Sequence, residues 1–239
     1  MARERAEKLP LVFLSRLADF FSLVEDTGTW PASLERAVVS FIPKSDRFAP
    51  LDLRPISIMS PIYRLWAAAH LPEVMAWQER WIDKAQFGAR PKHGTEDVFW
   101  SLALKIERSL LLGLPLYGFS LDYAKCFDNL PQEILLKLAE HMGMQPAILQ
   151  PLRAMYQRLK RRFKCGGGVG KEYAATNGIL QGCPLSIVPL NALVSIWCKA
   201  LRSEVPLVDP SAYVDDTGAL ATRPGTLNEA LAILMNMRL

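Results

Sequence analysis

Two acidic sites in the sequence combine the residue types and the setting that metal-assisted chemistry requires. Asp215 and Asp216 lie side by side in the run SAYVDDTGALA, among residues typical of β-strands. Asp122 follows the apolar run LYGFSL, so it stands at the end of a predicted strand. Carboxylate oxygens are the ligands that Mg²⁺ prefers, and the ion keeps room for water and phosphate oxygens. Carboxylates from two neighbouring strand ends could therefore hold a pair of Mg²⁺ ions for nucleotidyl transfer.

Each acidic site also has a purely structural interpretation. Two adjacent aspartates inside a strand are costly to bury without partners, and a turn over residues 215–218 would remove that cost. Asp122 could end a strand or cap a helix, although Asp128 is the better cap candidate because the next helix begins near Pro131. Taken alone, the aspartate pair favours the turn. Only the second acidic site shifts the balance towards a metal centre.

The elements that must position these carboxylates can be predicted from the hydrophobic pattern. Helical periodicity predicts helices over residues 9–25, 61–80, 96–112 and 131–142. Apolar, β-prone runs predict strands over residues 36–42, 116–121, 163–179 and 211–221. Mixed order of this kind indicates an α+β fold.

Three consecutive glycines interrupt the predicted strand region at residues 163–179. A β-hairpin is the natural interpretation, because glycines supply the backbone angles that a tight turn needs. A phosphate-binding loop is the weaker alternative, since Gly170-Lys171 is followed by Glu172 and no helical pattern begins there.

Composition and charge define the class of protein. The chain has 239 residues, 50% hydrophobic and 22% charged, which is a globular composition, and its net charge of +4 does not by itself indicate nucleic-acid binding. The four cysteines and three histidines are scattered, so we expect reduced cysteines and no structural zinc site. No apolar segment reaches ~18 residues, so no membrane span is expected. The N-terminal apolar run is too short for a signal peptide, which indicates an intracellular protein of the nucleus or cytoplasm.

Five sequence blocks resemble those of reverse transcriptases, most closely the type found in non-LTR (LINE-like) retrotransposons and group II introns. In chain order they are IPKSDRFAPLDLRPISIMSPIYRLW, QFGARPKHGTEDV, SLDYAKCFDNLP, NGILQGCPLS and YVDD. Each block is only moderately specific, but all five occur in the family's order and cover nearly the whole chain. The resemblance implies RNA-directed DNA synthesis with two Mg²⁺ ions, for which Mn²⁺ could substitute. It also implies an RNA template, a DNA primer and deoxynucleoside triphosphates as partners; no protein partner is indicated.

The resemblance further implies an α+β right-hand polymerase fold with fingers and palm subdomains and an antiparallel palm sheet. We expect one domain over residues 1–239, with fingers at about 1–97 and 131–184 and palm at about 98–130 and 185–239. The chain runs in an apolar helical pattern to its last residue, which suggests truncation before the thumb. A catalytically incomplete remnant that only binds nucleic acid is therefore the main alternative. Another right-hand polymerase, such as an RNA-dependent RNA polymerase or a telomerase-like enzyme, is a third hypothesis.

By resemblance, individual residues receive roles in the reaction. Asp122, Asp215 and Asp216 correspond to the family's metal ligands. Phe127 corresponds to the bulky ring beneath the incoming sugar, where it would exclude a 2′-hydroxyl, although it could also be an ordinary core aromatic. A lysine and an arginine of the fingers would hold the triphosphate, and a glycine would allow close approach to the backbone. The nucleotide contacts expected in addition to Phe127 are Lys44, Arg54, Gln181, Gly182 and Tyr213.

Two basic clusters could contact a nucleic-acid backbone. The run QRLKRRFK at residues 157–164 combines cations with an aromatic residue, which suits salt-dependent phosphate binding. A solvated helix end is an equally good interpretation of this run, because cations suit the helix dipole. A smaller cluster next to His93 is assigned to template contact. The predicted nucleic-acid contacts are Arg90, Lys92, Arg158, Lys160, Arg161 and Arg162.

Overall fold

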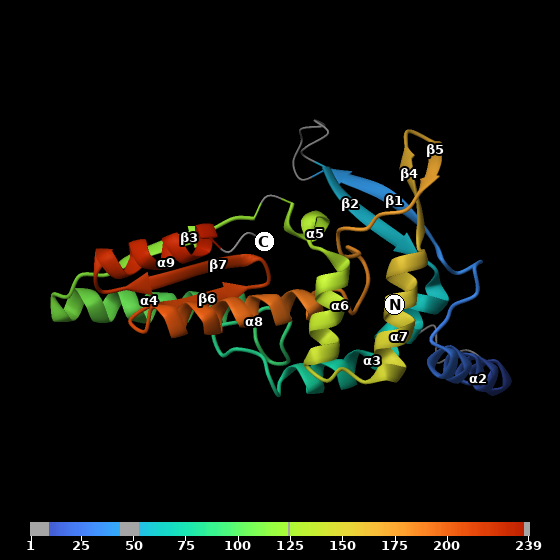
Figure 1. Ribbon diagram of the computed structural model, residues 1–239, viewed down its shortest axis with the longest axis horizontal. Helices are drawn as coiled ribbons and strands as arrows, with labels where there is room; N and C mark the ends of the chain where they lie inside the picture. Colours follow the sequence, from blue (N-terminus) through green and yellow to red (C-terminus); the bar gives the residue numbers. More distant parts are fainter. Residues whose placement is uncertain (1–9, 44–52, 124, 237–239) are drawn as a thin grey trace.

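The computed structural model describes residues 10–43, 53–123 and 125–236, and it contains two β-sheets connected by helices (Figure 1). The strands are β1 (Arg36–Pro43), β2 (Leu53–Met59), β3 (Tyr117–Leu121), β4 (Lys160–Cys165), β5 (Gly168–Tyr173), β6 (Asp209–Tyr213) and β7 (Asp216–Ala221). The helices are α2 (Leu11–Thr27), α3 (Pro61–Gln78), α4 (Thr95–Leu112), α5 (Cys126–Asn129), α6 (Gln132–His141), α7 (Pro146–Arg158), α8 (Ile187–Glu204) and α9 (Pro224–Asn236).

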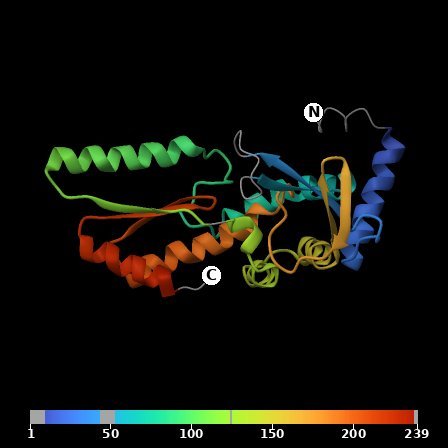
Figure 2. The same ribbon diagram turned by 90° about the horizontal axis from the view of Figure 1, so that it is seen from above.

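The three-stranded sheet is antiparallel, with the strand order β3-β7-β6. β6 and β7 form a hairpin in which Tyr213 pairs with Asp216, and on the other side of β7 Leu121 of β3 pairs with Thr217. Figure 2 shows α4 on one side of this sheet and α8 and α9 on the other. Alternate residues of β7 are buried, so one face of the strand packs more closely than the other.

The four-stranded sheet is mixed, with the strand order β2-β1-β4-β5. β1 pairs antiparallel with β2 and parallel with β4, so segments far apart in the sequence lie side by side. Ala37, Val39 and Met59 are buried on its inner face. Ile42 and Ile58 are exposed on the outer face, because successive side chains of a strand point to opposite sides.

One hydrophobic core extends under both sheets. Within this core, the rings of Trp30 and Trp66 meet edge to face with their centroids 5.3 Å apart, and Tyr63 packs against both. α8 extends this core to the three-stranded sheet, with contacts to both α6 and β6. α4, in contrast, has no buried residue and exposes Phe99 and Trp100 to solvent. No helix in the described ranges is long and apolar enough to cross a membrane.

The α+β prediction is confirmed, and the predicted helices and strands differ from the observed ones mainly at their ends. Residues 53–59, 146–158 and 187–204 were not predicted as elements, although they form β2, α7 and α8. α8 buries more than half of its residues, including the polar Asn191 and Ser195. The predicted turn over residues 215–218 is wrong by two residues: the turn is Val214-Asp215, and Thr217 and Gly218 belong to β7.

Candidate active site at the β6–β7 hairpin

The three aspartates of the two acidic sites lie at one end of the three-stranded sheet. Asp122 directly follows β3, Asp215 is the second residue of the β6–β7 turn, and Asp216 is the first residue of β7. β3 and β7 are antiparallel neighbours, so the end of β3 lies beside the start of β7. Adjacent strands are ~4.8 Å apart, so Asp122 and Asp216 are neighbours across the sheet. Tyr213, the last residue of β6, completes the hairpin as the partner of Asp216.

The electrostatic environment of Asp215 differs from that of an ordinary surface aspartate. Partial burial raises the pKa of Asp215, and the charges of Asp216 and Asp122 raise it further, while Arg54 acts in the opposite direction. Asp215 also lines a cavity of about 280 Å³ with mainly apolar walls, including Trp197. Negative charges near a partly buried carboxylate create a place where a cation is favoured.

The donor set fits a hard divalent cation better than zinc. Within the described ranges, no three acidic, cysteine or histidine side chains stand close enough to enclose a metal by themselves. Zinc sites need three or four such ligands in closed geometry. Mg²⁺ is typically held by one or two carboxylates, with water and substrate phosphates filling the remaining positions. Asp122, Asp215 and Asp216 repel one another, so an open arrangement is expected before a cation neutralises them.

The segment 85–88 packs against the hairpin turn and is hydrogen-bonded to the backbone of β6. The amide of Phe87 donates to Ala212 O at 2.9 Å, and the amide of Ala212 donates to Ala85 O at 2.8 Å. A Cβ atom on Gly88 would lie 2.4 Å from the amide nitrogen of Val214, so glycine is required by this close approach. The segment therefore fixes both β6 and the turn that follows it.

Of the predicted phosphate contacts of the fingers, Lys44 and Arg54, only Arg54 can be described. Arg54 is exposed on β2, and its charge acts weakly to lower the pKa of Asp215. Lys44 lies outside the described residues. The role of Arg54 in holding a triphosphate stays a prediction.

Phe127 and Gln181 lie together where α5 meets the segment before α8. Phe127 is half-buried, and its carbonyl accepts a hydrogen bond from the amide of Ile179 at 2.7 Å. The side chain of Gln181 donates to Asp128 Oδ1 at 3.3 Å. The prediction that Asp128 caps the next helix is wrong, because Pro131 occupies the N-cap of α6 and no side chain caps it.

Gly182 has a structural reason to be glycine that the sequence did not reveal. Its φ is 118°, and a Cβ atom there would lie 2.8 Å from Ser57 O of β2. The amide of Ser57 also donates to Gln181 O at 2.8 Å. The close approach at this glycine is therefore made by the protein's own strand β2, and the prediction that a nucleotide or template approaches it stays a prediction.

The basic residue Arg90 is fully engaged within the protein. Its Nε and Nη2 atoms donate to the two carboxylate oxygens of Glu79 at 3.0 and 2.6 Å, and its Nη1 atom donates to Gln86 O at 3.0 Å. The guanidinium thus holds the segment after α3 and has few donors left for a template. Lys92, in contrast, is exposed.

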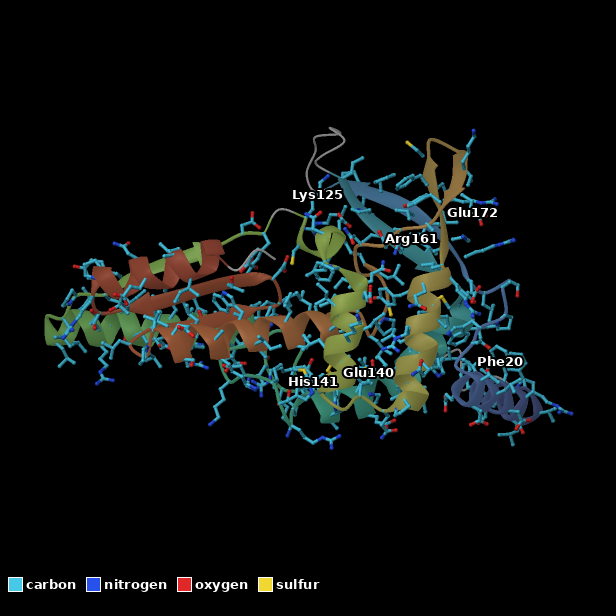
Figure 3. The ribbon with its side chains drawn as sticks, viewed as in Figure 1. Phe20, Lys125, Glu140, His141, Arg161 and Glu172 are labelled. Atoms are coloured by element: carbon cyan, nitrogen blue, oxygen red, sulfur yellow. The ribbon has the colours of Figure 1, made fainter. Side chains whose placement is uncertain are left out.

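The basic run divides between the end of α7 and strand β4, which determines where each side chain points. Arg158 ends α7 and lies 3.8 Å from Glu35. Arg161 points inward and is only 8% exposed, and burial lowers its pKa (Figure 3). An outward phosphate contact is therefore not available to Arg161 in this conformation.

The neighbours of Arg161 on β4 point to the opposite side. Lys160, Arg162 and Lys164 are exposed on the outer face of the four-stranded sheet, and Arg162 pairs with Glu172 at 2.9 Å. The prediction of a basic surface therefore applies to alternate residues of the run, as the period of a strand requires.

Several residues near the site were missed by sequence reasoning. Lys125 is exposed at the junction of the two sheets (Figure 3), with a left-handed φ of 50°, and it stands three positions after Asp122 in the block SLDYAKCFDNLP. Gln86 begins the block QFGARPKHGTEDV and contacts the turn residue Val214 directly. Both belong to recognised blocks, so their position in those blocks was the signal that could have identified them.

Comparison with known proteins decides the family. Residues 42–237 match the family model described as reverse transcriptase (RNA-dependent DNA polymerase). The chain belongs to the reverse transcriptase family. The recognition made from the five sequence blocks is therefore confirmed.

Two retrotransposon proteins are relatives of this reverse transcriptase domain. The Transposon TX1 uncharacterized 149 kDa protein of Xenopus laevis is 26% identical over 199 residues. The retrovirus-related Pol polyprotein from type-2 retrotransposable element R2DM of Drosophila melanogaster is 26% identical over 231 residues. The alignments cover 79% and 92% of this chain but only 15% and 21% of the relatives. The chain thus spans about a fifth or less of the length of these proteins.

Solved telomerase structures share the fold. Apo telomerase from Candida tropicalis, truncated from the C-terminal domain, has a TM-score of 0.63 at 16% identity over 84% of this chain and 46% of that chain. Telomerase from Candida tropicalis in complex with a TWJ fragment of telomeric RNA has a TM-score of 0.64 at 14% identity over 92% and 41% of the two chains. The predicted right-hand polymerase fold is confirmed; β3-β7-β6 form the palm sheet, and β2-β1-β4-β5 form the fingers sheet.

Proposed function

We propose that this domain catalyses RNA-templated DNA synthesis as part of a retroelement protein, with two Mg²⁺ ions held by Asp122, Asp215 and Asp216. The observation that carries this proposal is the meeting of the two acidic sites at one end of the palm sheet. Bound there, the ions would lower the pKa of the primer 3′-hydroxyl and neutralise charge on the leaving phosphates.

The remaining residues of the site bind and orient the substrates. Arg54 offers a planar fork of donors to phosphate oxygens and stands on a strand, so its position is defined by the fingers sheet. Gln181 and Phe127 lie side by side at the base of the fingers, where the sugar of a deoxynucleoside triphosphate would be recognised. The RNA template and the DNA primer would lie across the palm sheet, and their backbones would meet the exposed cations of the fingers.

Primer extension on an RNA template tests this function directly. The chain over residues 1–239 is compared with the Asp215→Asn variant, in Mg²⁺ and in Mn²⁺, with deoxynucleoside triphosphates. We expect template-directed product from the unchanged chain and a loss of at least ~100-fold in the variant, because a metal ligand that neutralises transition-state charge is removed. Equal incorporation by both proteins would refute the metal assignment. Binding of RNA without incorporation by either protein would instead support the alternative of a remnant that only binds nucleic acid.

A further inference from the structure

The turn that carries Asp215 contains an unusual backbone conformation. Val214 has a φ of 61°, which places a β-branched residue in the left-handed region. The left-handed conformation strains a valine, so it persists only where contacts with the surrounding structure stabilise it. What holds Val214 in this conformation therefore also determines where the adjacent Asp215 and Asp216 point.

The side chain of Gln86 holds both backbone polar groups of Val214. Its Oε1 atom accepts from the amides of Val214 at 3.2 Å and Gly88 at 3.3 Å. Its Nε2 atom donates to Val214 O at 3.3 Å and to Asn191 Oδ1 at 2.9 Å. A glutamine amide has two donors and room for two acceptor contacts, so Gln86 is fully satisfied while 0% exposed.

Two more buried side-chain amides, those of Asn191 and Gln78, orient Gln86. Asn191 of α8 donates to Gln78 Oε1 at 2.9 Å and to Gly88 O at 3.1 Å. Gln78 of α3 donates in turn to Ala89 O at 2.9 Å. Both side chains are 0% exposed. The three amides thus form a continuous hydrogen-bonded chain from α3, through α8, to the turn beside the carboxylates.

The anchoring of the segment 85–88 to the palm does not need these amides. The backbone hydrogen bonds between Ala212 and residues Ala85 and Phe87 already attach the segment to β6. The contact that the Gln86 side chain adds is to the turn itself. Buried polar networks are tolerated only when every member is paired, and a fully paired network defines one geometry where apolar packing would allow several.

We propose that Gln86 is a positioning residue for the metal-binding hairpin, held in its orientation by Asn191 and Gln78. It fixes Val214 in the left-handed conformation and so sets Asp215 and Asp216 beside Asp122 for joint metal binding. This role rests on the proposed function, because it concerns the geometry of the same metal site.

The test measures metal binding apart from catalysis. The Gln86→Met variant keeps the length of the side chain and removes all four hydrogen bonds. Binding of Mn²⁺ to the folded protein is titrated by electron paramagnetic resonance, and the Mg²⁺ concentration for half-maximal primer extension is measured alongside. Outer residues that orient metal ligands typically contribute 10–100-fold to metal affinity. We expect Gln86→Met to bind Mn²⁺ more weakly by that factor and to need a correspondingly higher Mg²⁺ concentration for primer extension. High Mn²⁺ should partly restore primer extension, and the affinity for the primer–template should be unchanged.

A matched control and a second variant separate positioning from stability. Gln132 is also a buried glutamine, and its Nε2 atom donates to the carbonyls of Asn177 at 3.1 Å and Gly178 at 2.7 Å. Gln132→Met should lower stability to a similar degree without changing metal affinity. If Gln86→Met does not fold, Asn191→Leu removes the partner that orients Gln86 and should weaken metal binding in the same direction.

The outcomes distinguish this role from the proposed function. Wild-type metal affinity in a folded Gln86→Met or Asn191→Leu variant would overturn the role of Gln86, provided that Asp215→Asn still weakens binding. An Asp215→Asn variant that binds Mn²⁺ as well as the wild type would overturn the metal assignment itself. Equal loss of metal affinity in Gln86→Met and Gln132→Met would show that the loss comes from general destabilisation of the protein. That result would also overturn the positioning role of Gln86.

Discussion

At the scale of single residues, the site depends on groups whose surroundings change their chemistry. Asp215 is drawn towards the neutral state by burial and by two neighbouring carboxylates, while Arg54 favours its charged form. Asp216 stands more exposed at the start of β7, so the two adjacent aspartates differ in environment. A site with one partly buried and one solvated carboxylate can hold a cation firmly and still leave positions for water and phosphate.

Phe127 provides a test of sugar selection at the residue scale. The Phe127→Val variant removes the ring that would stand beneath the sugar, so we expect incorporation of ribonucleotides relative to deoxynucleotides to rise by about 10-fold or more, the usual size of such a steric contact. Single-nucleotide incorporation with each nucleotide measures the ratio. Phe119→Val on β3 makes the same change in another partly buried phenylalanine and should leave the ratio unchanged. An unaltered ratio in Phe127→Val would show that the ring is only part of the core.

The pair formed by Glu79 and Arg90 predicts a pH-dependent contribution to stability. Hydrogen bonding from Arg90 lowers the pKa of Glu79, so this stabilisation is present above the unfolded pKa and is lost as the pH falls through the folded one. We expect Glu79→Gln to lower the free energy of unfolding by about 0.5 kcal/mol at pH 7, since exposed pairs are screened by solvent. Urea unfolding should show the difference disappearing below about pH 4. A difference that persists at pH 3 would contradict the ion-pair explanation.

At the scale of elements, the hairpin depends on segments that approach its backbone closely. β2 approaches Gly182, and the segment 85–88 approaches Val214. In both places an added Cβ would meet backbone atoms, which cannot rotate away as a side chain can. The approach of Gly88 to Val214 joins the fingers to the palm, whereas the approach of Gly182 to β2 lies within the fingers.

The substitution Gly88→Ala tests the contact behind the hairpin. Its Cβ would lie 2.4 Å from the amide nitrogen of Val214 and 2.6 Å from Val214 Cγ2, so the turn or the segment must shift. We expect a loss of about 1–3 kcal/mol in the free energy of unfolding, the range for overpacked sites. Chemical denaturation measures this loss. Gly225→Ala, where nothing lies within 4 Å of the added Cβ, should be close to neutral; similar losses in both variants would contradict the close-contact explanation.

At the scale of the whole molecule, charge is distributed unevenly despite the small net value of +4. The outer face of β4 gathers Lys160, Arg162 and Lys164, and Arg54 stands on the same face of the fingers sheet. The palm presents its carboxylates towards the fingers. A nucleic acid that crosses the domain would thus meet cations on the fingers and, on the palm, the carboxylates proposed to bind metal.

The exposed lysines of β4 predict a salt-dependent contribution to binding. The double variant Lys160→Gln with Lys164→Gln should bind single-stranded RNA more weakly and should reduce the slope of log K against log salt by roughly 1.4, at 0.7 for each phosphate that a lysine no longer neutralises. Fluorescence anisotropy at several salt concentrations measures the slope. The control is the double variant Lys84→Gln with Lys199→Gln. It removes the same charge from the segment after α3 and from α8. Equal slopes for the two double variants would show that β4 does not bind the RNA backbone.

Local pattern in the sequence was sufficient to locate the acidic residues. An aspartate after an apolar strand and an aspartate pair within another are visible from a few neighbouring residues, because strand periodicity and the avoidance of unpaired buried charge act locally. The ordered blocks around them added the family and the right-hand fold. Helical periodicity likewise predicted α2, α3, α4 and α6, whereas α7 and α8 were missed.

Only the tertiary structure decided which side chains meet. Gln78, Gln86 and Asn191 come from separate segments and form one network only after α3, α8 and the palm hairpin pack together. Arg90 donates hydrogen bonds to the carboxylate of Glu79, and Arg161 is buried because β4 pairs with β1. A residue type and its near neighbours do not specify such partners, since long-range packing determines which hydrogen bonds and charges become available to a substrate.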